Sequence, residues 1–178
     1  MAHYAAFLRG MNLGGRRITN QDLCACFEAL GLADVAAFLA SGNVVFTARG
    51  AADAIARRIE RGLAEQLDYE VPTFVRGAAE VQAIAARRPF AGRRGADARG
   101  KAQVLFLAAA PAPAASKAAL ALASDDDWLE LEGRECYWLP AGRLSDSALD
   151  LKALERALGM TTIRTKNTVD RLAARHFA

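Results

Sequence analysis

The sequence predicts an α+β protein made of two ferredoxin-like halves in tandem, each with the order strand, helix, strand, strand, helix, strand. Three observations support this prediction. The 178 residues are 53% apolar and 24% charged, which suits one domain or two small ones. Short apolar runs alternate with segments whose apolar residues recur at helical spacing. The order of these elements occurs twice, although the second half lacks its last strand and ends in a helix.

The first half is predicted to span residues 1–77. Residues 3–9 form a short apolar run that ends at a glycine, as a buried strand does. Thr19 and Asp22 are typical of a capped helix start, and Gly31 ends that helix. Further strands are predicted at 34–40, 43–48 and 71–76, and a second helix at about 51–69.

A helix and a basic loop are predicted to connect the halves over residues 78–101, and the second half follows over 102–178. Gly133-Arg134 separates two of its strands, as in a tight hairpin turn. Apolar residues at helical spacing predict a last helix from Thr165 to Phe177. The remaining strands are predicted at 103–107, 128–132 and 135–139, and the remaining helices at 114–123 and 147–158.

Opposite charges gather in two segments. Residues 87–101 hold six basic side chains and one acid, a formal charge of +5, and residues 125–135 hold six acids and one base, a charge of −5. The chain as a whole carries +3, so its basic character is local. No apolar run approaches the length of about 20 residues that a membrane span needs. The start of the sequence does not resemble a leader peptide, so we expect a cytoplasmic protein that does not bind membranes.

The residue types that most catalytic and metal sites need are poorly placed in this chain. Cys24 and Cys26 lie two apart on a predicted helix and point to different sides, while His3 and His176 lie near the chain ends. The sequence therefore predicts no metal site, no cofactor and no catalytic residue. Whether the protein is an enzyme stays open.

The strongest local signal is the loop Arg9–Arg17, between the first strand and the first helix. Its glycines can adopt left-handed turns that aim successive backbone N–H groups at one point, and its arginines can add charge-assisted hydrogen bonds. A helix N-terminus also favours an anion. The ligand-binding residues expected here are Arg9, Gly10, Asn12, Gly14 and Gly15. The structural alternative is a tight turn with solvated arginines.

The turn Ser41-Gly42-Asn43 joins two predicted strands. In a ferredoxin-like sheet the first and third strands are antiparallel neighbours, so Asn43 should lie beside the Arg9 loop. We therefore add Ser41, Gly42 and Asn43 to the expected site. The alternative is a hairpin turn closed by bonds from the Ser41 or Asn43 side chain to the backbone.

Four motifs resemble a bacterial family called domain of unknown function 1697. They are the Arg9–Gly15 loop, the Ser41–Phe46 turn, Tyr137-Trp138, and an eroded Thr161–Val169 stretch in which Lys166 stands where an aromatic residue is usual. The resemblance implies an α+β fold with ferredoxin-like pieces, and it implies no activity.

Arg164 and Asn167 lie at the start of the last predicted helix. One interpretation is that they reach the same site from the second half, and the alternative is a structural role. Our leading hypothesis from the sequence is a small anionic or phosphate-bearing ligand at the Arg9 loop. The alternatives are nucleic-acid binding by residues 87–101, and assembly into a homodimer through pairing of the +5 and −5 segments between copies.

Overall fold

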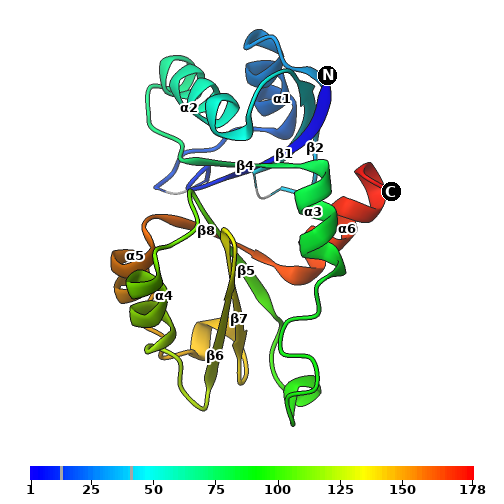
Figure 1. Ribbon diagram of the computed structural model, residues 1–178. Coiled ribbons are helices and arrows are strands. Elements are labelled where there is room, and N and C mark those ends of the chain that lie inside the picture. The colour runs from blue at the N-terminus through cyan, green and yellow to red at the C-terminus, as the bar shows by residue number, and fades with distance from the viewer. Residues whose placement is uncertain (13, 41) are drawn as a thin grey trace. The chain divides into compact units, whose positions relative to one another are not determined.

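The computed structural model describes residues 1–12, 14–40 and 42–178, and the chain divides into two compact units (Figure 1). Unit 1 comprises Met1–Ile84 and Leu172–Ala178, and unit 2 comprises Ala85–Arg171. The chain thus enters unit 1 twice, and both termini belong to it. Our division at residues 77 and 101 followed the order of the elements and kept the last residues with the second half.

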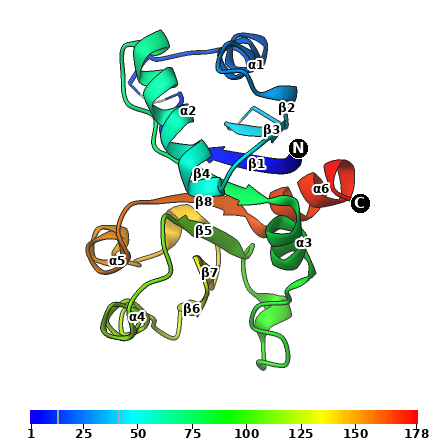
Figure 2. The same ribbon diagram turned by 45° about the horizontal axis from the view of Figure 1, so that its top comes forward.

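Unit 1 is built on a four-stranded antiparallel sheet with the strand order β2-β3-β1-β4. The elements in this part of the chain are β1 (Ala2–Leu8), α1 (Asn20–Ala29), β2 (Ala33–Ala37), β3 (Asn43–Ala48), α2 (Ala52–Leu67), β4 (Thr73–Gly77) and α3 (Ala78–Ala86). Helices α1 and α2 lie on the same side of this sheet (Figures 1 and 2). Their order is the one that the sequence predicts for the first half.

The core of unit 1 lies between those two helices and the sheet. Ile55, Ile59 and Leu63 recur at helical spacing along α2, and all three are buried against Phe27 of α1 and Phe46 of β3. Burying a large aliphatic or aromatic side chain contributes about 1.5–3 kcal/mol, so this apolar layer holds the helices on the sheet.

Unit 2 is built on a second four-stranded antiparallel sheet, with the strand order β6-β7-β5-β8. Trp138 lies in its core and donates from Nε1 to the buried Asp127 carboxylate at 2.8 Å. The elements in this part of the chain are β5 (Gln103–Leu107), α4 (Pro113–Leu120), β6 (Asp127–Glu132), β7 (Glu135–Pro140), α5 (Leu151–Leu158), β8 (Thr161–Thr165) and α6 (Lys166–His176).

The second half does have a closing strand, and our prediction that it lacks one is wrong. Residues Thr161–Thr165 form β8, which pairs antiparallel with β5 from Gln103↔Thr165 to Leu107↔Thr161. The strand holds one aliphatic residue, Ile163, so it lacks the apolar run that marks the other strands. Its polar residues are accommodated by hydrogen bonds, because both the amide and the hydroxyl of Thr161 donate to Glu155.

The last residues of the chain pack within unit 1. Gln82 of α3 donates a hydrogen bond from Nε2 to the carbonyl of Phe177. The His176 ring lies edge-on to Phe38, with ring centroids 5.8 Å apart. The α+β class is therefore confirmed, with one sheet in each unit. In the described residues, the helices are all too short or too polar to cross a bilayer.

Candidate functional site

The end of β1 and the turn before β3 form one corner of unit 1. The sheet register pairs Phe7 with Asn43, and the amide of Leu8 donates to the carbonyl of Gly42 at 2.8 Å. The amide of Arg9 then donates to the carbonyl of Pro72 at 2.9 Å. The Arg9 loop and the turn before β3 therefore lie side by side, as the antiparallel arrangement required.

Gly42 is fixed in this corner by its backbone and by its neighbours. Its φ is +71°, a conformation that side chains disfavour. A Cβ at this position would lie 3.1 Å from Met11 Cγ and 3.2 Å from Leu8 Cβ. Met11 is buried, so the loop packs this side chain against the turn.

The Asn43 side chain stabilises the turn through a hydrogen bond within the protein. Its side chain is fully buried, and Nδ2 donates to the carbonyl of Phe38 at 3.0 Å, while the Phe38 amide donates back to the carbonyl of Asn43. These bonds close the connection between β2 and β3, which agrees with the structural alternative for Asn43. Ser41, the first residue of the predicted turn motif, lies outside the described residues.

The outer part of the loop is exposed. Asn12, Gly14 and Gly15 face solvent, and both glycines have positive φ angles, +64° and +81°. In the described part of this loop, the amides of Gly14 and Gly15 have no backbone hydrogen-bond partner. Arg16 lies over the Tyr69 ring, 4.2 Å from its centroid. The loop therefore offers backbone donors and positive charge to solvent, whereas its inner part is packed.

The N-terminus of α1 adds less to an anion site than expected. The Thr19 hydroxyl accepts from the Asp22 amide at 3.0 Å and donates to the Asp22 carboxylate at 2.7 Å. Thr19 therefore caps the helix, as predicted from the sequence. However, this cap occupies one of the first amides, and the carboxylate opposes an incoming anion.

Comparison with known proteins now decides the family. The family described as "Protein of unknown function (DUF1697)" matches residues 1–137. The chain belongs to this family. The chain is also similar in structure to "conserved bacterial protein SP0830 from Streptococcus pneumoniae", with a TM-score of 0.76 and 20% sequence identity, over 100% of this chain and 99% of that one. At this identity the likeness shows the fold alone. No curated protein matches the chain.

Two of the residues predicted to bind the ligand of this DUF1697 protein, Arg164 and Asn167, belong to unit 2. The Arg9 loop and the turn before β3 belong to unit 1. Arg164 is buried on β8, and burial lowers its pKa to about 10. Its Nη1 donates to the carbonyl of the preceding residue, Ile163, at 2.8 Å. Arg76 on β4, also buried, makes the same bond to Val75 at 3.0 Å. One edge strand of each sheet, β4 and β8, therefore uses a buried arginine in the same way, which favours a structural role for Arg164. Asn167 is exposed in the first turn of α6.

The basic segment 87–101 contacts the acidic hairpin of its own unit. Arg87 pairs with Glu130 at 3.1 Å and with Glu132. Arg99 donates to the carbonyls of Asp125 and Asp126. These contacts are intramolecular, so the opposite charges of the two segments give less support to pairing between copies.

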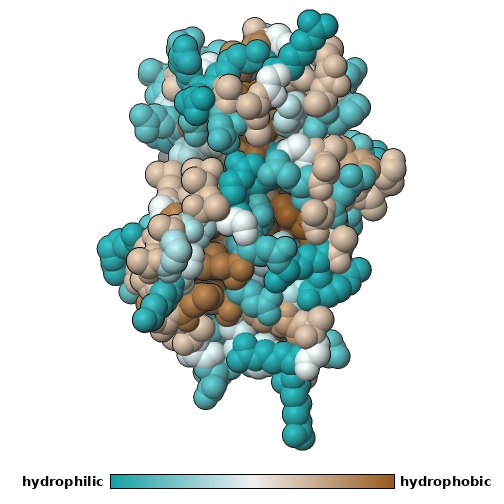
Figure 3. Space-filling model, viewed as in Figure 1, coloured by the Kyte–Doolittle hydropathy of each residue, from teal (hydrophilic) through white to brown (hydrophobic). Residues whose placement is uncertain are grey.

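The Trp128 ring forms cation–π contacts with two arginines of this segment. The guanidinium groups of Arg93 and Arg99 lie over its ring, 3.6 and 4.1 Å from the centroid. Hydrophilic residues cover the tip of the loop that this segment forms, at the bottom of the view in Figure 3. With Arg87, and with Arg88, which donates to the Ala85 carbonyl, four of its six basic side chains are thus engaged within unit 2, which weakens the nucleic-acid hypothesis.

The thiols do not offer a nucleophile. Burial raises the pKa of Cys136 to about 12 and also raises the pKa values of Cys24 and Cys26 above their ordinary value. A protonated thiol is a weak nucleophile at neutral pH. In the part of the chain that the structure describes, no three His, Cys, Asp or Glu residues are grouped to hold a metal ion.

The feature that sequence reasoning missed is Lys166. In the sequence this residue stands out only as a departure from the family motif. The structure buries this lysine at the start of α6, where its Nζ donates to the Ala85 carbonyl near the end of α3. A charged residue in an otherwise apolar or aromatic motif position was the signal that could have drawn attention to it.

Proposed function

We propose that the protein binds a small anionic or phosphate-bearing ligand at the corner of unit 1 formed by the Arg9–Arg17 loop and the turn before β3. The ligand contacts the backbone donors at Gly14 and Gly15 and the side chains of Arg9, Arg16 and Arg17. Glycine-rich backbone that presents several N–H groups is suited to phosphate oxygens. Asn43, which is buried and bonded to Phe38, acts by holding the turn rather than by touching the ligand.

One observation carries this proposal: the same corner of unit 2 is made without such a loop. There, Leu107 donates to the carbonyl of Arg134 at 2.9 Å, as Leu8 does to Gly42 in unit 1. The connection from β1 to α1 takes 11 residues, and that from β5 to α4 takes five alanines and prolines, Ala108–Ala112. The scaffold therefore does not require the glycines and arginines of unit 1.

The two units also support the finer fold assignment. Each sheet has its first strand in the centre, between the third and fourth strands, and each unit repeats the element order β-α-β-β-α-β. We propose on this basis that both units are ferredoxin-like.

The test is a titration of the ¹⁵N-labelled full-length protein with phosphate, sulfate and nucleoside phosphates, followed by NMR. We expect saturable shifts of the amides of residues 9–17. The double variant Arg16→Gln/Arg17→Gln should weaken binding about tenfold or more, because each charge-assisted hydrogen bond is worth about 1.5–3 kcal/mol when shielded.

The matched control is Arg57→Gln/Arg58→Gln, which removes the same charge from an exposed face of α2 in the same unit. It should leave the affinity unchanged. Equal weakening by both pairs would show a general charge effect, and the absence of saturable shifts in residues 9–17 at millimolar ligand would refute the proposed site.

A further inference from the structure

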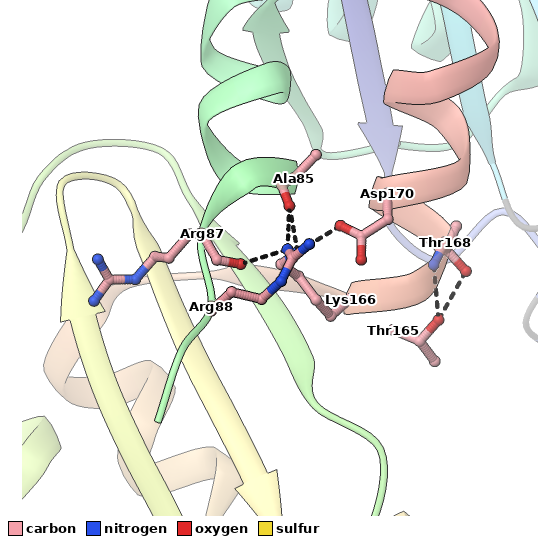
Figure 4. A network of polar contacts seen from close by, with 7 residues as sticks. All are labelled: Ala85, Arg87, Arg88, Thr165, Lys166, Thr168 and Asp170. Atoms are coloured by element: carbon pink, nitrogen blue, oxygen red, sulfur yellow. Dashed lines mark hydrogen bonds and ion pairs between the residues drawn. The ribbon is translucent and has the colours of Figure 1, made fainter. Parts of the chain in front are cut away.

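Lys166, the first residue of α6, is a buried cation in unit 2. Only 7% of Lys166 is exposed to solvent. Its Nζ donates to the carbonyl of Ala85 at 2.9 Å and forms an ion pair with Asp170, one turn further along α6 (Figure 4). An ammonium group has three N–H donors, and these contacts use two of them.

A second cation reaches the same oxygen. Arg88 donates from Nη1 to the carbonyl of Ala85 at 2.9 Å, so two positive groups converge on one carbonyl, as Figure 4 shows. The carbonyl lies in the last turn of α3, where the helix dipole attracts cations. Asp170 balances only one of the two charges. In the same view, Arg87 extends away from Lys166, in keeping with its pairing with Glu130.

These cations lie at a cavity of about 670 Å³, which is within the range of small-molecule sites. The cavity is formed by the backbone and side chains of residues 87–97, with Ala102, Lys166 and Asp170 completing the wall. Five basic residues and two acidic ones, Asp97 and Asp170, line it, an excess of three positive charges. Even without Arg87, which is neutralised by the hairpin, the wall remains positive.

The fold does not require a lysine at this position. In unit 1, helix α3 also begins directly after the edge strand, and its first residue is Ala78. A buried ion pair such as Lys166–Asp170 adds little stability over apolar residues of similar size, because desolvation offsets the attraction. The ammonium group and its third donor therefore call for an explanation beyond folding.

We propose that this cavity of unit 2 is a second anion site, which binds a small phosphate-bearing molecule through Lys166 and Arg88. A phosphate oxygen takes the third donor of Lys166 and a donor of the Arg88 guanidinium, and the exposed Arg94 faces the rest of the ligand's charge. The site is separate from the Arg9 loop and does not depend on it.

The experiment uses the full-length protein with inorganic phosphate and pyrophosphate as probes, followed by NMR and calorimetry at constant ionic strength. We expect saturable shifts of residues 88–97 and 166–170, with pyrophosphate bound more tightly than phosphate. Arg88→Gln, which keeps the buried Lys166–Asp170 pair, should weaken pyrophosphate binding about tenfold. Lys166→Met should weaken it at least as much.

Two controls separate this site from the rest of the protein. Arg143→Gln, an exposed charge of unit 2 outside this cavity, should leave the affinity unchanged. Arg16→Gln/Arg17→Gln should weaken only the binding that the shifts of residues 9–17 report, so either site can fail while the other stands.

The proposal is overturned if the shifts of residues 88–97 increase without saturation, or if Arg88→Gln and Arg143→Gln behave alike. A last experiment measures the binding of a fluorescent single-stranded oligonucleotide to the protein. Binding of the oligonucleotide that Arg88→Gln weakens, with no binding of pyrophosphate, would assign the surface to nucleic acid and overturn the small-molecule site.

Discussion

The two units share a scaffold and differ in what is added to it. Both have the same strand order, the same closing bond at the corner of the sheet, and a buried arginine on the edge strand, Arg76 in one and Arg164 in the other. Only unit 1 has the long loop after its first strand, and only unit 2 has a buried lysine at the start of its last helix. The shared features therefore mark what the fold needs, and the unshared ones mark candidates for function.

The largest difference in stability should appear at the turns before β3 and β7. Gly42 and Gly133 both have positive φ angles, +71° and +57°, but a Cβ on Gly133 would meet only Glu135 Oε2, at 3.8 Å. Gly133→Ala should cost about 1 kcal/mol for the left-handed backbone, and Gly42→Ala about 2–3 kcal/mol, because Leu8 and Met11 must also move.

Urea denaturation can assign each loss to its unit. Both tryptophans, Trp128 and Trp138, lie in unit 2, so their fluorescence follows that unit, whereas circular dichroism follows both. Gly42→Ala should shift the dichroism transition more than the fluorescence transition. Equal costs for the two glycine variants would remove the distinction between the two turns.

A smaller change in stability is expected from substitutions at the start of the first helix of each unit. Thr19 caps α1 with its side chain, whereas Ala112 at the start of α4 makes no such bond. Thr19→Ala should therefore lower the stability by about 1 kcal/mol, and Ala112→Ser should raise it by about half as much. Thermal unfolding of the two variants beside the wild type measures both changes. A loss of stability in Ala112→Ser would mean that the two helix starts are not comparable.

The smallest effect concerns pH and the C-terminal residues of unit 1. Burial, assisted by Arg175, lowers the pKa of His176 below its ordinary value of 6.5. The folded state therefore favours the neutral ring, and its contribution to stability is complete above pH 6.5 and lost as the pH falls below that value. In the described residues, Nε2 of this ring is buried without a hydrogen-bond partner.

The check compares urea denaturation of the wild type and His176→Gln between pH 7.5 and pH 5. The wild type should lose more stability than the variant over this range, and other titrating groups cancel in the difference. Parallel curves would show that His176 does not sense pH through its packing against Phe38.

Much of the fold could be predicted because its signals are local. Apolar spacing along α2 and the cap at Thr19 depend on neighbours in the chain, and both predictions agree with the structure. The position of the Arg9 loop beside the turn before β3 followed from the expected antiparallel pairing of the first and third strands, which the structure contains. The family resemblance is also confirmed.

The features that the sequence does not predict depend on contacts between residues far apart in the chain. Strand β8 is held by pairing with β5 and by Glu155, so its threonines give no apolar pattern. The pairing of Arg87 with Glu130 joins residues 43 positions apart. The roles of Asn43 and Lys166 likewise depend on the carbonyls of Phe38 and Ala85, which composition and spacing cannot indicate.

The return of the chain to unit 1 has a consequence during synthesis. Residues Leu172–Ala178 belong to that unit, and Phe177 accepts a bond from Gln82. Residues 1–84 of unit 1 are synthesised before unit 2, but unit 1 can be completed only after residues 172–178 have also left the ribosome. Until then Phe38 lacks the His176 ring that packs against it, so a nascent or truncated chain carries an unfinished first unit beside a second unit that already has all its residues.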